Sequence, residues 1–189
     1  MGLIITVVVI ILLVGGYIAL YNGLQTAKVH AEEAWSQIDV QLKRRNDLIP
    51  NLVETTKGYA KHEKETLSQV IQLRNQLAEL PTDAHQEKMA VSNQLTSSLK
   101  SIFALAESYP DLKANQEFGK LMEELTNTEN KIAYSRQLFN SSVAVFNQKL
   151  VTFPSNMVAK FHHFTKMDYL EVPVAEKSSP KGIILEIKE

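Results

Sequence analysis

The first 27 residues of the chain contain no charged side chain, and Leu3 to Tyr21 form an almost unbroken apolar run. At a rise of about 1.5 Å per residue, this run spans about 28 Å as a helix, close to the roughly 30 Å hydrocarbon core of a bilayer. The remainder is polar with a helical pattern. The run therefore predicts a membrane anchor at residues 1–24 that carries a water-exposed body.

Two other interpretations of the apolar run are weaker. A cleaved signal peptide normally has a basic start and a small-x-small cleavage site, and neither is present here. A buried core helix of this length needs an apolar partner of similar size, and the rest of the chain offers none. A spanning helix is the favoured interpretation.

Basic residues indicate which side of the membrane carries the body. No Lys or Arg precedes the run, whereas Lys28 follows it closely and Lys43, Arg44 and Arg45 lie further on. The positive-inside rule therefore favours an outside N-terminus and a cytoplasmic body. The absence of cysteine is compatible with either side. A net charge of −1 gives no general attraction to nucleic acid, so we expect no nucleic-acid partner.

Apolar residues with 4-3 spacing follow the anchor from Ala31 to Leu77, which predicts a long helix continuing the membrane helix as far as Leu80. Prolines 81, 110 and 154 then divide the chain, predicting helices to about Ser108 and Leu150 and a short helix to about Phe164. Short connections between long helices make neighbours antiparallel. The predicted fold is all-α: a transmembrane helix followed by an elongated antiparallel bundle of three long helices and one short helix, over residues 25–168.

Residues 169–189 form a predicted C-terminal tail. Residues 172–176 and 183–188 are rich in Val and Ile and flank Ser179-Pro180-Lys181-Gly182, a sequence typical of a type I turn. A disordered tail is one alternative, because an isolated hairpin is marginal in water. The other is a β-hairpin stabilised by pairing with tails of neighbouring chains.

Two polar stretches, residues 44–53 and 129–140, interrupt the apolar pattern. Arg45 occupies a core-facing position and needs a carboxylate, for which Glu129 is the candidate. Pro50 lies inside a helical stretch, so we expect a kink near Asn46. The predicted structural or interaction motif comprises Arg44, Arg45, Asp47, Pro50, Asn51, Glu129, Asn130, Arg136, Asn140 and Pro154.

These stretches carry a family resemblance. The sequences AWSQIDVQLKRRNDLIPNLVETTKGYAKHE and ENKIAYSRQLFNSSVAVFNQKLVTFPSNMVAKFHHF resemble the LemA family of bacterial membrane proteins. The similarity covers residues 21–169. It implies a single N-terminal membrane helix in a bacterial cell membrane and an all-helical bundle. The family has no established enzymatic activity that the resemblance could imply for this chain.

The sequence contains few motifs typical of catalysis or metal binding. The five histidines are scattered without zinc-ligand spacing, and the chain has no cysteine, phosphate-binding glycine loop or nucleophile elbow. We therefore expect no enzyme activity, no cofactor and no metal. The Arg, Asp and Glu side chains of the polar stretches are suitable for acid–base chemistry, but helix-borne polar residues of this kind usually fix helix register. Asn130, Asn140 and Asn147 are interpreted as register-fixing residues or contacts to another subunit.

Two function classes remain. The first is a non-catalytic membrane scaffold that self-assembles and organises or shapes the membrane or supports envelope homeostasis, with the lipid bilayer and other membrane proteins, such as a membrane protease, as partners. The second is a membrane-anchored sensor that binds a ligand through its Arg/Asp/Asn cluster. Homo-oligomerisation is expected because Gly15, Ala19 and Gly23 form a small-residue stripe that permits close helix approach.

Overall fold

The protein is all-α in the part that the computed structural model describes, residues 1–60 and 62–171, with no strand among them. This confirms the predicted fold class for these residues, while the predicted β-hairpin lies outside them. The helices are α1 (Gly2–Tyr59), α2 (Lys64–Glu79), α3 (His85–Ser108), α4 (Pro110–Lys113), α5 (Gln116–Val151) and α6 (Ser155–Phe161).

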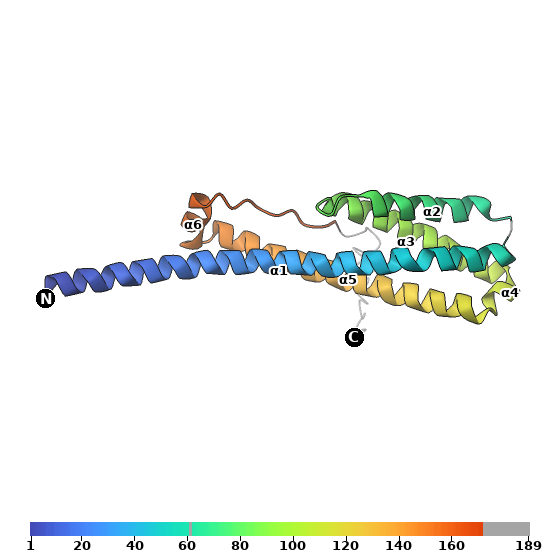
Figure 1. The fold of residues 1–189 in the computed structure, drawn as a ribbon, viewed down its shortest axis with the longest axis horizontal. Coiled ribbons are helices and arrows are strands. Elements are labelled where there is room, and N and C mark those ends of the chain that lie inside the picture. Colours follow the sequence, from blue (N-terminus) through green and yellow to red (C-terminus); the bar gives the residue numbers. More distant parts are fainter. Residues whose placement is uncertain (61, 172–189) are drawn as a thin grey trace, which may run out of the picture.

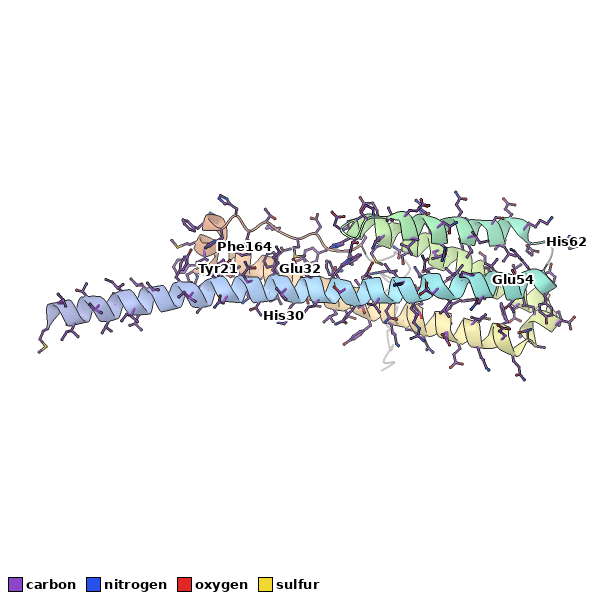
Figure 2. All side chains as sticks on the ribbon, viewed as in Figure 1. Tyr21, His30, Glu32, Glu54, His62 and Phe164 are labelled. Atoms are coloured by element: carbon purple, nitrogen blue, oxygen red, sulfur yellow. The ribbon has the colours of Figure 1, made fainter. Side chains whose placement is uncertain are left out.

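The molecule is a long rod built on α1 and α5, which pack against each other in antiparallel orientation (Figure 1). The α2–α3 hairpin covers the half of this pair that is farther from the N-terminus. At the other end, α6 turns back against α1, and the extended residues 165–171 run beside the rod where α2 and α3 do not reach. Figure 2 labels Tyr21 and Phe164 at the α6 end and Glu54 and His62 at the opposite end.

The candidate membrane-spanning segment and the bundle share one helix, because α1 continues for 58 residues without interruption. Buried residues begin at Leu24 and recur along one face as far as Thr56, whereas Leu3 to Val14 are exposed. Within the described chain, α1 contains the one segment long and apolar enough to cross a membrane. The predicted continuation of the anchor into the body is confirmed.

One predicted helix boundary is wrong. The helix expected to run to Leu80 ends at Tyr59, and the chain reverses before α2 begins at Lys64. The single helix that the sequence predicted as far as Leu80 is therefore divided into α1 and α2, and the short α4 is an addition to the predicted helices. The apolar spacing conceals the reversal because Val70, Leu73 and Leu77 face the core on α2 as their counterparts do on α1.

The core divides into two clusters. The larger runs along the bundle, and each of its large aliphatic or aromatic side chains contributes roughly 1.5–3 kcal/mol by leaving water; it includes Trp35, Ile38, Ile49, Leu95, Ile102, Ile132 and Phe139. The smaller cluster joins α6 to α1 through Leu24, Val158 and Ala159. It fixes the end of the bundle against α1, next to its apolar segment.

Candidate functional site

A buried arginine connects three helices at the middle of the bundle. Arg45 on α1 is 0% exposed. Its Nη1 donates to Glu129 Oε2 on α5 at 2.7 Å and to Thr96 Oγ1 on α3 at 2.9 Å. Its Nη2 donates to the hydroxyl and the carbonyl oxygen of Ser92. The predicted Arg45–Glu129 ion pair is confirmed.

The electrostatics of this cluster favour a structural role for the ion pair. Burial lowers the pKa of the Arg45 guanidinium below its usual value, while the charge of Glu129 opposes the shift and nearby Arg136 adds to it. The Glu129 carboxylate also accepts from Thr96 Oγ1 at 3.0 and 3.1 Å. Both oxygens are therefore used in joining helices, as expected for a pair that specifies register.

The other residues of the predicted motif are dispersed. Arg136 is buried and donates to Asn93 Oδ1 at 2.9 Å, which joins α5 to α3. Arg44 forms an exposed pair with Glu124 at 3.4 Å. The remaining exposed members of the motif are Asp47, Pro50, Asn51, Asn130 and Pro154. The two polar stretches thus meet at Arg45 and Glu129 but do not form one convergent site.

Pro50 has a role that its position in α1 explains. A proline has no N–H, so the carbonyl of Asn46 loses its helical donor. That carbonyl instead accepts from Arg74 Nε of α2 at 3.4 Å, and Asn46 Nδ2 donates back to the Arg74 carbonyl at 3.2 Å. The proline therefore makes a docking point for α2, while α1 continues as a helix on both sides of it.

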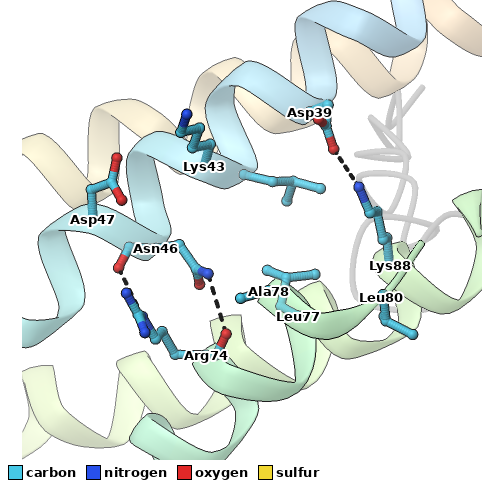
Figure 3. A pocket seen from close by; sticks show the side chains of 10 residues that line it. Asp39, Lys43, Asn46, Asp47, Arg74, Leu77, Ala78, Leu80 and Lys88 are labelled. Atoms are coloured by element: carbon cyan, nitrogen blue, oxygen red, sulfur yellow. Dashed lines mark hydrogen bonds and ion pairs between the residues drawn. The ribbon is translucent and has the colours of Figure 1, made fainter. Parts of the chain in front are cut away.

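A shallow cleft of about 310 Å³ lies beside this contact, between α1 and the α2–α3 hairpin (Figure 3). Lys88 Nζ donates to Asp39 Oδ1 at 2.7 Å across it. Lys43 and Asp47 also line the cleft, and neither has an ion pair among the residues that the structure describes. The cleft has charges of both signs, so it has no strong preference for an anion or a cation.

Two asparagines on α5 hold the extended segment against the rod. Asn147 binds both the N–H and the C=O of Met167, at 3.0 and 2.8 Å. Asn140 binds the same two groups of Leu170, at 2.9 and 3.0 Å. Seven helical residues rise about 10.5 Å and three extended residues about 10 Å, so the spacings match. Asn140 and Asn147 fix register within the chain, and Leu170 becomes a core residue that is 2% exposed.

His85 packs face to face on Trp35, with ring centroids 3.9 Å apart and planes at 28°. Burial is the main cause that lowers the pKa of His85 below its usual value, and the charge of Lys88 adds to it. Asp83 and Asp39 oppose this shift. The neutral imidazole is therefore the form that the folded chain prefers.

We expect this histidine to make the bundle less stable in mild acid. The unfolded chain binds a proton to His85 at higher pH than the folded chain does, so stability falls as pH decreases from about 6.5 toward the folded pKa. Urea unfolding measures the free energy of unfolding at about pH 7.5 and 5.5. The decrease between these two pH values should be smaller in His85→Gln. His62→Gln, an exposed control, should leave the difference unchanged. An equal pH dependence in all three proteins contradicts the assignment.

The small-residue stripe of α1 is only partly available to a second membrane helix. A Cβ built on Gly23 lies 3.4 Å from Nζ of Lys149, whereas one on Gly15 has nothing within 4 Å. Gly23 therefore faces α5 of its own chain. Self-association of membrane helices through Gly15 and Ala19 stays a prediction. Gly23, the third residue of the stripe, is better explained by packing within the bundle.

Sequence reasoning missed several partners of the predicted residues. Ser92 and Thr96 complete the Arg45 cluster, but small hydroxyl residues on a helix give no pattern that distinguishes them. Arg74 and Lys88 were also missed, since their partners come from another helix. One usable signal was the repeat of asparagine at 140 and 147, which lies on one helical face.

Comparisons with known proteins agree with this architecture. The model of the LemA family matches residues 34–182. The chain belongs to the LemA family. Protein LemA of Metamycoplasma hominis is 27% identical over 92% of this chain and 76% of its own length.

Other relatives of this LemA chain are named for the magnetosome. The magnetosome protein MamQ of Magnetospirillum gryphiswaldense is 23% identical over 79% of this chain and 64% of its own. MamQ 2 of Paramagnetospirillum magneticum is 20% identical over 89% and 71%. The chain therefore spans about two thirds of the length of these MamQ relatives.

Proposed function

We propose that this LemA chain is a non-catalytic, single-pass membrane scaffold whose body self-assembles and organises or shapes the membrane. The observation that carries the proposal is the continuity of α1. One helix serves as membrane anchor and as the central element of the bundle, so any assembly of the bodies directly positions the membrane segments. The magnetosome names of relatives support a setting in bacterial membranes.

The side chains support a mechanical role more than a chemical one. The buried Arg45 and its half-buried partner Glu129 are used in holding helices together. The cleft beside Asp39 and Lys88 is small and of mixed charge. We therefore propose that the protein is no enzyme, and that the positive-inside pattern places its body in the cytoplasm. Its partners would be the bilayer, further copies of itself and other membrane proteins, including a membrane protease.

The surface suited to self-assembly is a second apolar stripe on α5. Tyr134, Leu138 and Val145 recur at helical spacing but face away from the core, with 69%, 36% and 51% exposure. They border shallow grooves between α5 and α1, to which α1 contributes Val40, 62% exposed. Exposed apolar stripes of this kind typically mark interaction surfaces.

Introducing negative charges into this apolar stripe of α5 should dissociate the proposed oligomer. Tyr134→Glu combined with Leu138→Glu should shift the detergent-corrected mass from an oligomer to a monomer in light scattering. Ala104→Glu, at an exposed position of α3, is the matched control and should leave the mass unchanged. A monomeric mass for the unaltered chain contradicts self-assembly, and an unchanged oligomer in the double variant contradicts this surface.

A ligand-binding sensor is the second candidate, and the cleft is the observation that favours it. Lys43 and Asp47 line the cleft with charges that no neighbour in residues 1–60 and 62–171 pairs. A thermal-shift titration with phosphate and with an acidic peptide tests this function. A saturable shift that Lys43→Ala abolishes favours the sensor; no shift with either probe favours the scaffold.

A further inference from the structure

The apolar run of α1 includes residues that already contact the end of α6. The hydroxyl of Tyr17 lies 2.7 Å from Nε2 of His162, the residue that follows α6. Tyr17 belongs to the run from Leu3 to Tyr21, which extends about 28 Å as a helix, close to the roughly 30 Å thickness of a hydrocarbon core. A membrane placed on this run therefore includes residues that lie beside His162.

Contacts between α6 and the end of the anchor are extensive. The rings of Tyr21 and His162 lie 4.6 Å apart, and Tyr21 also packs near Phe164, as Figure 2 shows. Below them, Leu24 is 0% exposed against Val158 and Ala159. Because these contacts fix α6 beside α1, a membrane positioned on residues 1–21 brings α6 to the boundary between headgroups and acyl chains.

The outer surface of α6 has the composition that such a boundary favours. Val158 and Ala159 pack inward, whereas Met157 and Phe161 of α6 are 64% and 74% exposed. Phe153, in the turn just before α6, is 79% exposed. Met157 and Phe161 lie one turn apart and share a face. Exposed aromatic and aliphatic side chains of this density are unfavourable in water and are typical of helices that lie in a membrane surface.

Charge around α6 points to anionic lipid. The chain contains no acidic residue from Asn130 through Met167, whereas Lys149, Lys160 and Lys166 lie on or next to α6. Basic residues near a membrane surface each contribute about 1 kcal/mol of attraction to anionic headgroups. The apolar face therefore lies within a positively charged segment.

We propose that the α6 segment, residues 151–164, inserts into the leaflet on the body side of the membrane, with its apolar face in the outer acyl region and its lysines at anionic headgroups. The protein then has two membrane contacts, the α1 anchor and a surface-lying α6 segment fixed to it. This inference rests on the membrane anchorage of the proposed function but not on self-assembly or on the absence of catalysis.

The natural lack of cysteine makes a direct test practical. The full chain carrying Phe161→Cys, with a fluorophore on the thiol, is reconstituted in vesicles of phosphatidylcholine with about one third phosphatidylglycerol. We expect lipid-borne quenchers to reduce its fluorescence strongly and aqueous iodide to reduce it weakly. Ala104→Cys, at an exposed position of α3 in the body and outside the proposed self-assembly surface, is the matched control and should show the reverse.

A third label separates the possible outcomes. Val9→Cys reports on the anchor and should be quenched by lipid in every case in which α1 spans the membrane. If the label at Val9 is quenched by lipid and the label at Phe161 by iodide, the α6 inference fails while the anchorage stands. If Phe161 is protected from both quenchers, a second protein copy covers α6 and the inference is wrong.

A variant tests the apolar face itself. Phe153→Ser with Phe161→Ser, labelled at Met157→Cys, should lose most lipid quenching, because these substitutions lie on the exposed face and leave the buried contacts of Val158 intact. Val145→Ser with Leu138→Ser, labelled at the same position, should retain it. Equal lipid quenching in both proteins would overturn the assignment of this face.

Discussion

Arg45→Ala should lower the free energy of unfolding by about 3 kcal/mol, the lower end of the cost of breaking a buried ion pair, because the Glu129 carboxylate left behind is 36% exposed and can be hydrated. The substitution removes a guanidinium that is 0% exposed, together with its hydrogen bonds to Glu129, Thr96 and Ser92. It also leaves a cavity where three helices meet. Chemical denaturation followed by circular dichroism measures the loss.

The matched control is the neighbouring arginine. Arg44→Ala removes an exposed pair with Glu124, for which a loss of about 0.2–1 kcal/mol is expected. Arg45→Leu combined with Glu129→Leu should be more stable than Arg45→Ala, since no charge is left without a partner. A double-mutant cycle that gives no coupling between Arg45 and Glu129 would show that the pair does not stabilise the bundle.

Asn140→Ala combined with Asn147→Ala should release residues 165–171 from the rod. Each asparagine makes two hydrogen bonds to the backbone of the extended segment, and four bonds at about 1 kcal/mol each give a loss of about 4 kcal/mol. Hydrogen exchange checks this, because the amides of Met167 and Leu170 should exchange much faster while those of α5 remain protected.

Asn130→Ala provides the comparison for this experiment. Asn130 is exposed on the same helix and makes no hydrogen bond to the extended segment, so its loss should not change exchange at Met167. Protection of Leu170 that survives the double substitution would assign the segment's stability to the burial of Leu170 instead.

Periodicity and prolines were sufficient to predict most of the fold. The end of α3 at Ser108 and of α5 at Val151 agrees with prolines 110 and 154, which stop helices for a local steric reason. The reversal after Tyr59 was missed because Gly58 is only a weak helix breaker and the connection contains no proline. Apolar spacing reports which residues face the core but not where the chain turns around.

The polar site was predictable only in part, for a related reason. A charged residue at an apolar position, such as Arg45, requires a partner, and few acids were available in the second polar stretch. The contacts of Asn46 with Arg74 and of Lys88 with Asp39 depend on the α2–α3 hairpin. The turn before α3 was predicted, but the reversal that folds α2 back on α1 was not, so the sequence pattern could not place those side chains together.

Because α1 is one unbroken helix from Gly2 to Tyr59, a change in the tilt of its N-terminal part also moves its far end. From Tyr21 to Tyr59 the helix extends about 57 Å beyond the apolar run. Transmembrane helices change their tilt to accommodate bilayer thickness. A change of about 10° at the membrane would displace the far end, near Glu54, by about 10 Å. In the proposed membrane assembly, a small change in bilayer thickness would therefore displace the far end of α1 far enough to make or break contacts between neighbouring copies.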